Sequence, residues 1–408
     1  MKNKNNMASV SAVELPEILP SERSKRDLCS RSPALDIIRI FACINVLSIH
    51  FLMNGGFYSE PILGGRMCAM LFMRALFMCC VPLFLMLSGY LLCNKMPERK
   101  YYGRIWRILF VYLAASLFCV YGYRFLYNRV CGLMGNEPID FAPLGVGHLL
   151  ELILDYEAGR YAWYIEMYLG LFLCIPFLNV MYQKLPSKKV KQVLILTGFV
   201  LSILPNLVNS FNFTQPGWWA NPTMRDQNGT LYTYTNLIPD YWLSLFPFTY
   251  YFVGCYLREY GLKIKLWKNA LLLACSIALY GGFSLWRNWG TTFVSGTWSM
   301  WNNPFVFSVS VLVFCFFLNC KYRWMPTWLR NLLAYLSELT LGAYLVSGTF
   351  DNLVYPYIKQ QQPIVFQRLD LYIIVVPFVF VCSMLVSWMI HLLYTLLQRS
   401  GRLLRKKT

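Results

Sequence analysis

Two ionisable side chains, Arg39 and His50, lie in the otherwise apolar stretch RIFACINVLSIH near the N-terminus. Eleven residues of α-helix turn through about 1100°, which is about 20° beyond three full turns, so both side chains would project from one face of a helix. An ionisable side chain at membrane depth costs free energy and is a functional candidate by default. We predict that Arg39 and His50 are catalytic.

Each of these residues also has a simpler interpretation. Asp36 lies three residues before Arg39 on the same side of the helix, so Arg39 could be a paired anchor at the membrane boundary. His50 alone could pack against a neighbouring helix. The face that the two residues share favours a common function over two separate structural roles.

A carboxylate and an arginine pair are further candidates. Glu166, in YAWYIEMYLG, is predicted to lie at membrane depth, where ionisable residues are rare and usually functional, so we predict a catalytic role for it. Glu338, in YLSELTLGAYL, is a weaker candidate. Arg104 and Arg107 would share one helix face at the mouth of a span, and paired guanidinium groups can hold phosphate. The alternative is that both arginines only mark the cytoplasmic side.

The composition places these residues in a membrane. The chain is 57% hydrophobic and 14% charged, whereas a soluble protein carries roughly 25% charged residues. Its net charge of +18 is distributed in short runs between apolar segments, which argues against a nucleic-acid partner. The 14 cysteines form no CxxC motif, and the sequence contains no P-loop, GxSxG or HExxH motif, so we predict no metal site.

Ten apolar stretches are long enough to cross a bilayer, which requires about 20 residues each. We therefore predict an all-α polytopic membrane protein, with a tail at 1–33, a ten-span domain at 34–397 and a basic tail at 398–408. The predicted spans lie near 34–53, 68–93, 104–127, 161–182, 191–210, 238–257, 269–287, 304–320, 331–350 and 370–397.

The distribution of Lys and Arg predicts the orientation. If the N-terminus is cytoplasmic, the inner segments hold 27 of the 37 basic residues and the outer segments hold 8. This excess predicts that both termini are cytoplasmic in a multi-pass protein of the cell (inner) membrane. The outer segment 128–160 contains GHLLELILDY, a predicted amphipathic surface helix. The outer segment 211–237, rich in aromatic and amide residues, is either an interfacial belt or a sugar-facing surface.

Several segments, in this order, resemble the integral-membrane acyltransferase family 3, which includes bacterial O-antigen, exopolysaccharide and peptidoglycan O-acetylases. They are the Arg-x10-His of the first span, VPLFLMLSGYLL, the R-x-x-R, WYIEMYLGLFLCIPFLN, YYFVGCYL and LSELTLGAYLVS. The resemblance covers about residues 34–397. Two positions depart from the family's pattern: Tyr161 lies where a histidine is common before the tryptophan, and Ser347 where a histidine often follows Tyr-Leu.

The resemblance implies an O-acyltransferase that moves an acyl group, with acetyl expected, from cytoplasmic acyl-CoA to a hydroxyl of an extracytoplasmic or lipid-linked sugar. Arg104 and Arg107 would bind the CoA phosphates, and His50 would deprotonate the acceptor hydroxyl. Whether the acyl group passes through a covalent intermediate is left open. The expected partners are membrane lipid and a carbohydrate acceptor, and a homodimer is left open.

Two other functions compete with this one. Ten spans with buried ionisable residues could form a transporter or flippase for a lipid-linked sugar or a small metabolite. The chain could also be a non-enzymatic subunit of polysaccharide assembly. Acyl transfer distinguishes the three, because a transporter moves its substrate unchanged and an assembly subunit would tolerate loss of His50.

Overall fold

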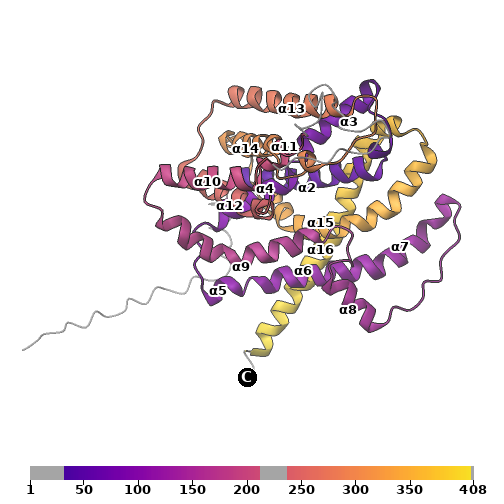
Figure 1. The fold of residues 1–408 in the computed structure, drawn as a ribbon. Coiled ribbons are helices and arrows are strands. Elements are labelled where there is room, and N and C mark those ends of the chain that lie inside the picture. The colour runs from indigo at the N-terminus through magenta and orange to yellow at the C-terminus, as the bar shows by residue number, and fades with distance from the viewer. Residues whose placement is uncertain (1–31, 212–236, 406–408) are drawn as a thin grey trace, which may run out of the picture.

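The computed structural model describes residues 32–211 and 237–405, which form a bundle of helices (Figure 1). Within these residues the only extended pairing consists of two isolated bridges, Pro61 with Thr292 and Ile62 with Trp289. The predicted tail at 1–33 and the segment 211–237 lie almost entirely outside the described residues.

Each of the ten predicted spans coincides with helical structure. Eight helical segments of the described chain are long and apolar enough to cross a membrane, which confirms an all-α polytopic membrane protein. The sixth and ninth predicted spans, which correspond to α12 and α15, are not among the eight, so the number ten stays a prediction. The helices are α2 (Pro33–Asn54), α3 (Gly64–Phe77), α4 (Cys80–Leu92), α5 (Arg99–Tyr102), α6 (Ile105–Leu117), α7 (Tyr123–Val130), α8 (Val146–Leu154), α9 (Trp163–Lys184), α10 (Lys188–Ser202), α11 (Pro205–Val208), α12 (Phe246–Tyr260), α13 (Leu266–Asn288), α14 (Pro304–Asn319), α15 (Thr327–Gln361) and α16 (Tyr372–Arg405).

The second predicted span is two helices, α3 and α4, separated at Met78–Cys79. Pro82 falls in the first turn of α4, where its missing N–H group costs no helical hydrogen bond. Further along α4, a Cβ atom on Gly89 would lie 2.0 Å from the carbonyl oxygen of Tyr251 in α12. Glycine at this position therefore lets the backbones of α4 and α12 approach closely.

The ninth predicted span, 331–350, is part of a longer helix, because α15 continues to Gln361. One stripe of α15 carries polar side chains at intervals of three or four residues, the spacing of one helix face. All of them are buried in the bundle: Ser337, Thr340, Tyr344, Ser347 and Asp351.

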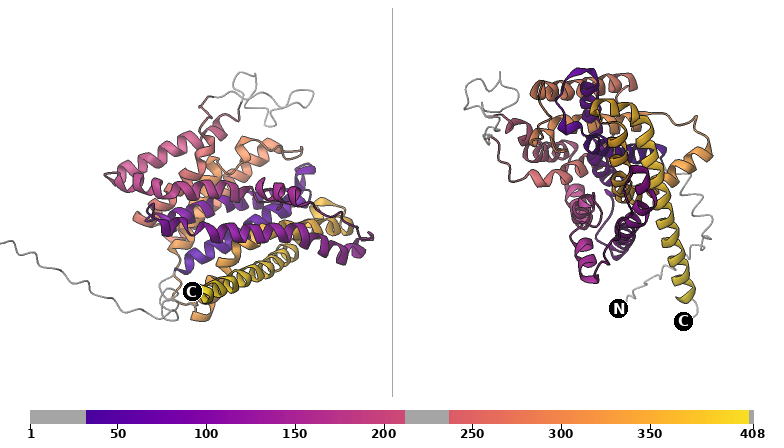
Figure 2. Two further views of the ribbon diagram at one scale, coloured as in Figure 1. Left: turned by 90° about the horizontal axis from the view of Figure 1, so that it is seen from below. Right: turned by 90° about the vertical axis from the view of Figure 1, so that its right-hand side faces the viewer.

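The relative directions of the central helices agree with strict alternation of the spans. Helices α2 and α6 run in the same chain direction as α15, and α16, the long yellow helix that leads to the C-terminus in Figure 2, runs in the opposite direction beside α15. The orientation of the whole bundle in the membrane stays a prediction. For α2 and α15 the direction follows from the contacts Arg39–Ser337 and Asn54–Asp351. For α6 and its continuation it follows from Arg107–Glu338 and Cys119–Leu345. For α16 it follows from Ser387–Leu339 and His391–Tyr335.

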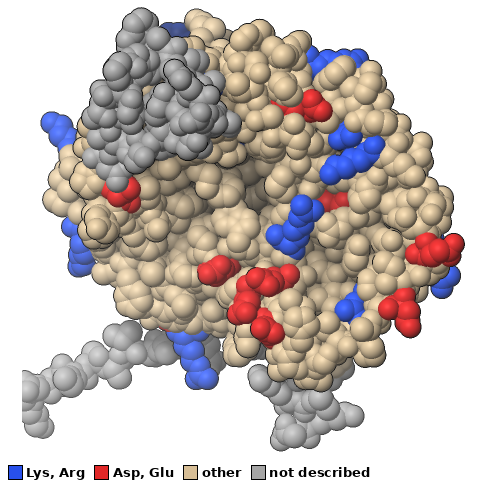
Figure 3. Space-filling view, turned by 45° about the vertical axis from the view of Figure 1, so that its right-hand side comes forward, with Lys and Arg blue, Asp and Glu red and all other residues tan. Residues whose placement is uncertain are grey.

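Helix α8 confirms the predicted amphipathic surface helix. Its apolar residues Val146, Leu150 and Leu154 are exposed and recur every four residues, as expected of a helix lying at a membrane surface. Figure 3 shows one face of the molecule, where uncharged surface predominates and charged side chains of both signs gather around a central hollow.

Candidate active site

A cavity of about 370 Å³ lies between α2, α4, α6, α9, α15 and α16. Arg39 and His50 both line it, from the one face of α2 that their spacing predicts. Arg107, Glu338 and His391 line it near Arg39, at the end where the first turn of α6 lies beside the middle of α15. The cavity therefore joins a region of charged side chains to the imidazole of His50, about 16 Å further along α2.

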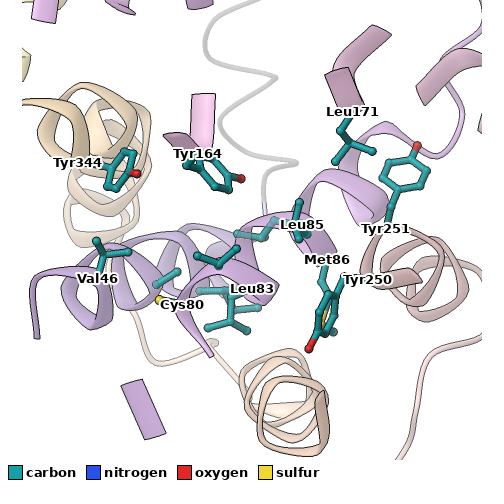
Figure 4. Close-up of a cluster of buried hydrophobic side chains, with 14 of the residues drawn as sticks. Val46, Cys80, Leu83, Leu85, Met86, Tyr164, Leu171, Tyr250, Tyr251 and Tyr344 are labelled. Atoms are coloured by element: carbon teal, nitrogen blue, oxygen red, sulfur yellow. The ribbon is translucent and has the colours of Figure 1, made fainter. Parts of the chain in front are cut away.

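The wall between these two ends is largely apolar. In Figure 4, Tyr164 and Tyr344 lie across from Val46 and Cys80, and all four residues line the cavity. Near His50, the stacked indole rings of Trp163 and Trp301 complete the lining, with 4.6 Å between their centroids. A long apolar cavity with few polar groups at its ends is typical of a small-molecule site.

At the charged end, Ser337 joins Arg39 to Asp36. The Ser337 hydroxyl donates to Asp36 Oδ1 at 2.5 Å, and Arg39 Nη1 donates to Ser337 Oγ at 3.4 Å. Arg107 Nη2 lies 4.0 Å from Glu338 Oε2, and both side chains are partly exposed to solvent. An exposed pair at this distance contributes little to stability, so Arg107 can leave Glu338 for a stronger anion at low cost.

The structure separates two predicted residues from the cavity. Arg104 precedes the first turn of α6 and is exposed, and it does not line the cavity that Arg107 lines. Glu166 is exposed on α9 and also lies outside the lining. Their roles in cofactor binding and catalysis stay predictions, without support from the cavity geometry.

At the other end, His50 lies against a buried carboxylate. Its ring stacks on Tyr161 with 3.5 Å between centroids, and its Nδ1 lies 3.6 Å from Asp351 Oδ2. Asp351 is only 2% exposed. Its Oδ2 accepts hydrogen bonds from the Tyr161 hydroxyl at 2.8 Å and from Asn54 Nδ2 at 3.3 Å. His50, Asp351, Tyr161 and Asn54 form one polar cluster in an otherwise apolar core.

The sequence reasoning missed Asp351, which follows the predicted end of the ninth span by one residue. The signal was nevertheless present, because Asp351 continues the polar stripe of α15 four residues after Ser347. Among the described residues, no group of three or more His, Cys, Asp or Glu side chains is arranged to hold a metal ion. The site thus offers an imidazole, a carboxylate and arginines, the groups used in proton transfer and anion binding.

Comparison with known proteins identifies the family. Residues 32–392 match the family model described as an acyltransferase domain. Neither the curated proteins nor the solved structures contain a significant match. The family model covers nearly the whole helical bundle, including α2 and its cavity residues. The chain therefore belongs to the integral-membrane acyltransferase family 3.

Proposed function

We propose that this acyltransferase moves an acyl group, acetyl in the first instance, from cytoplasmic acyl-CoA to a hydroxyl of an extracytoplasmic or lipid-linked sugar at the cell membrane. The observation that carries the proposal is the single cavity joining Arg107 and Arg39 to His50. A donor can enter such a cavity from one side while an acceptor meets it at the other end.

The charged end suits the donor. Arg107 lines the cavity where the positive-inside pattern predicts the cytoplasm, and CoA is rich in phosphate. A guanidinium group binds phosphate through charge-assisted, bidentate hydrogen bonds. Arg104 lies one helical turn away and adds positive charge outside the cavity. The thin acyl-bearing arm of CoA would then extend past Arg39 along the apolar wall.

The imidazole end suits the transfer. His50 takes the proton of the acceptor hydroxyl, and the hydroxyl oxygen attacks the thioester carbonyl carbon. The new C–O bond forms as the C–S bond breaks, and the CoA thiolate leaves and takes up a proton. The products are an ester on the sugar and free CoA, with no oxidant, reductant or metal consumed.

The decisive experiment compares the surface polysaccharide of cells with and without the protein. Extracted polysaccharide is analysed by NMR, and the acids that mild base releases are measured by mass spectrometry. We expect an ester-linked acyl group to disappear with the protein and to return on complementation.

A second experiment tests the purified protein in proteoliposomes. Acetyl-CoA that carries ¹⁴C in its acetyl group is added to the outside solution. An acyltransferase leaves base-labile ¹⁴C on added polysaccharide. Identical polysaccharide from both strains, together with transport of an unmodified sugar lipid, would contradict the proposal and favour a transporter.

A further inference from the structure

The carboxylate of Asp351 is held in a fixed position by its neighbours. Asp351 comes from α15, and two donors converge on its Oδ2: the hydroxyl of Tyr161, just before α9, and the amide of Asn54, one turn after His50 on α2. The Asn54 amide also lies 3.1 Å from the Tyr161 hydroxyl oxygen. Two other chain segments therefore fix one oxygen of a carboxylate that is almost fully buried.

The imidazole of His50 is fixed by the same cluster. Its ring stacks on Tyr161 with an interplanar angle of 21°, and the Tyr161 backbone oxygen in turn accepts a hydrogen bond from the Tyr344 hydroxyl. Stacking opposes rotation of the ring out of this plane. The edge of the imidazole that carries Nδ1 is therefore kept close to Asp351, 3.6 Å from its Oδ2.

The one interaction the cluster leaves incomplete is between His50 and Asp351. Nδ1 of His50 is buried, has no hydrogen-bond partner among the described residues, and lies 3.6 Å from Asp351 Oδ2. A buried polar atom without a partner is costly, which argues against a purely structural role for this arrangement. Catalytic hydrogen bonds are often long in the absence of substrate and tighten when substrate binds.

We propose that Asp351 is a positioning residue for His50, an inference that rests on the proposed function. When the site is occupied, Asp351 accepts the Nδ1–H of His50, so the Nε2 nitrogen keeps its lone pair and can take the proton of the acceptor hydroxyl. The negative carboxylate then stabilises the imidazolium until the proton passes to the departing CoA thiolate. Asp351 itself gains and loses no proton.

The test measures acetyl transfer by the full-length protein in proteoliposomes. The substrates are acetyl-CoA and polysaccharide extracted from host cells that lack the protein, and the readouts are free CoA and base-labile acetate on the polysaccharide. Asp351→Asn keeps the shape of the side chain and removes its charge. We expect kcat to fall by about tenfold or more, because replacing the carboxylate that orients the histidine of a catalytic triad by its amide costs up to about 10⁴-fold. The KM for acetyl-CoA should change by less than about twofold, because the charged end of the cavity lies about 16 Å away.

A double-mutant cycle separates positioning from folding. In a His50→Ala background, Asp351→Asn should have no further effect on transfer, because Asp351 acts only through the imidazole. The matched control is Asp370→Asn, which removes an exposed carboxylate that pairs with Arg66 at 2.8 Å, and it should transfer as the parent does. Size-exclusion profiles and acetyl-CoA binding establish that each variant is folded.

If Asp351→Asn does not fold, Tyr161→Phe takes its place. That change keeps the ring on which His50 stacks and removes the hydroxyl that donates to Asp351. It should lower kcat by a smaller factor, again only when His50 is present. Unchanged kcat in the substituted protein, or an equal loss with and without His50, overturns the role of Asp351 and leaves the proposed function standing. Absence of transfer by the parent protein overturns both.

Discussion

Arg74 and His50 are both ionisable side chains buried inside predicted membrane spans, and they differ in how completely they are hydrogen-bonded. Arg74 Nε donates to the Tyr58 hydroxyl at 2.9 Å, Nη1 to the Tyr280 hydroxyl at 3.1 Å and Nη2 to the Ser299 carbonyl oxygen at 3.1 Å. Every nitrogen of its guanidinium group has a partner. His50, by contrast, has a buried nitrogen without a hydrogen bond and faces a cavity.

The comparison shows that depth in the membrane does not by itself identify a reactive residue. Arg74 also packs over the ring of Phe293, with its guanidinium carbon 4.4 Å from the ring centroid, and it does not line the cavity. Its polar groups are satisfied within the fold, which is how a structural buried charge is accommodated. Two features of His50 indicate function: its Nδ1 has no hydrogen bond, and its side chain lines the cavity.

The largest expected effect comes from His50→Ala. It removes the proposed general base, whose contribution is typically about 10²–10⁴-fold in rate, while the charged end of the cavity keeps its donor-binding groups. Purified protein should therefore bind acetyl-CoA normally and transfer its acetyl group at a rate lower by that factor. Transfer at the parent rate by a folded variant would break the comparison and make His50 a packing residue like Arg74.

A smaller effect is expected from Arg107→Ala. A charge-assisted hydrogen bond contributes about 1.5–3 kcal/mol, so the KM for acetyl-CoA should rise about tenfold or more with kcat little changed. Arg107→Lys should recover only part of the loss, because an ammonium group cannot form the bidentate contact. Arg104→Ala, outside the cavity lining, should raise KM less. Full recovery with lysine would reduce both arginines to markers of the cytoplasmic side.

The smallest effect on transfer is expected from Arg74→Met, although its effect on folding is large. The change removes the guanidinium partner of the Tyr58 hydroxyl, while the Tyr280 hydroxyl and the Ser299 carbonyl keep only their mutual contact at 3.5 Å. A buried polar group left without a partner costs roughly 1–3 kcal/mol. Thermal unfolding in detergent should therefore occur at a lower temperature, while the rate per folded molecule stays within about twofold. The control is Arg66→Met on the same helix, whose exposed ion pair contributes little. A stable Arg74→Met protein that no longer transfers acetyl would assign Arg74 to the reaction.

Features fixed by local sequence were predictable. Helical periodicity alone placed Arg39 and His50 on one face, and the structure finds both side chains lining the same cavity. The break at Met78–Cys79 also has a local cause, because in an unbroken helix the ring of Pro82 would clash with the carbonyl of the residue four positions earlier, which is Met78.

The composition of the site depended on tertiary structure. Asp351 reaches His50 only because α15 lies parallel to α2 with Ser337 level with Arg39, a register that hydropathy does not encode. Glu166 is the opposite case. Hydropathy predicted a position for it within a membrane span, but hydropathy does not reveal that its side chain lies outside the cavity. Tyr161 occupies the position where a histidine is common in the family. Its ring stacks on the ring of His50, so this departure from the family's pattern lies in the site itself.

The apolar wall of the cavity also bears on the energy supply of the cell. A protein that links the two sides of a membrane through a titratable imidazole risks becoming a pathway for protons, which would dissipate the electrochemical gradient. Proton conduction requires a continuous chain of water or exchangeable groups. Apolar side chains of the lining, such as Val46, Val81 and Leu87, supply none, whereas the hydroxyls of Tyr164 and Tyr344 lie among them. An acyl chain along this wall would exclude water from it, so an occupied site would also limit the passage of protons.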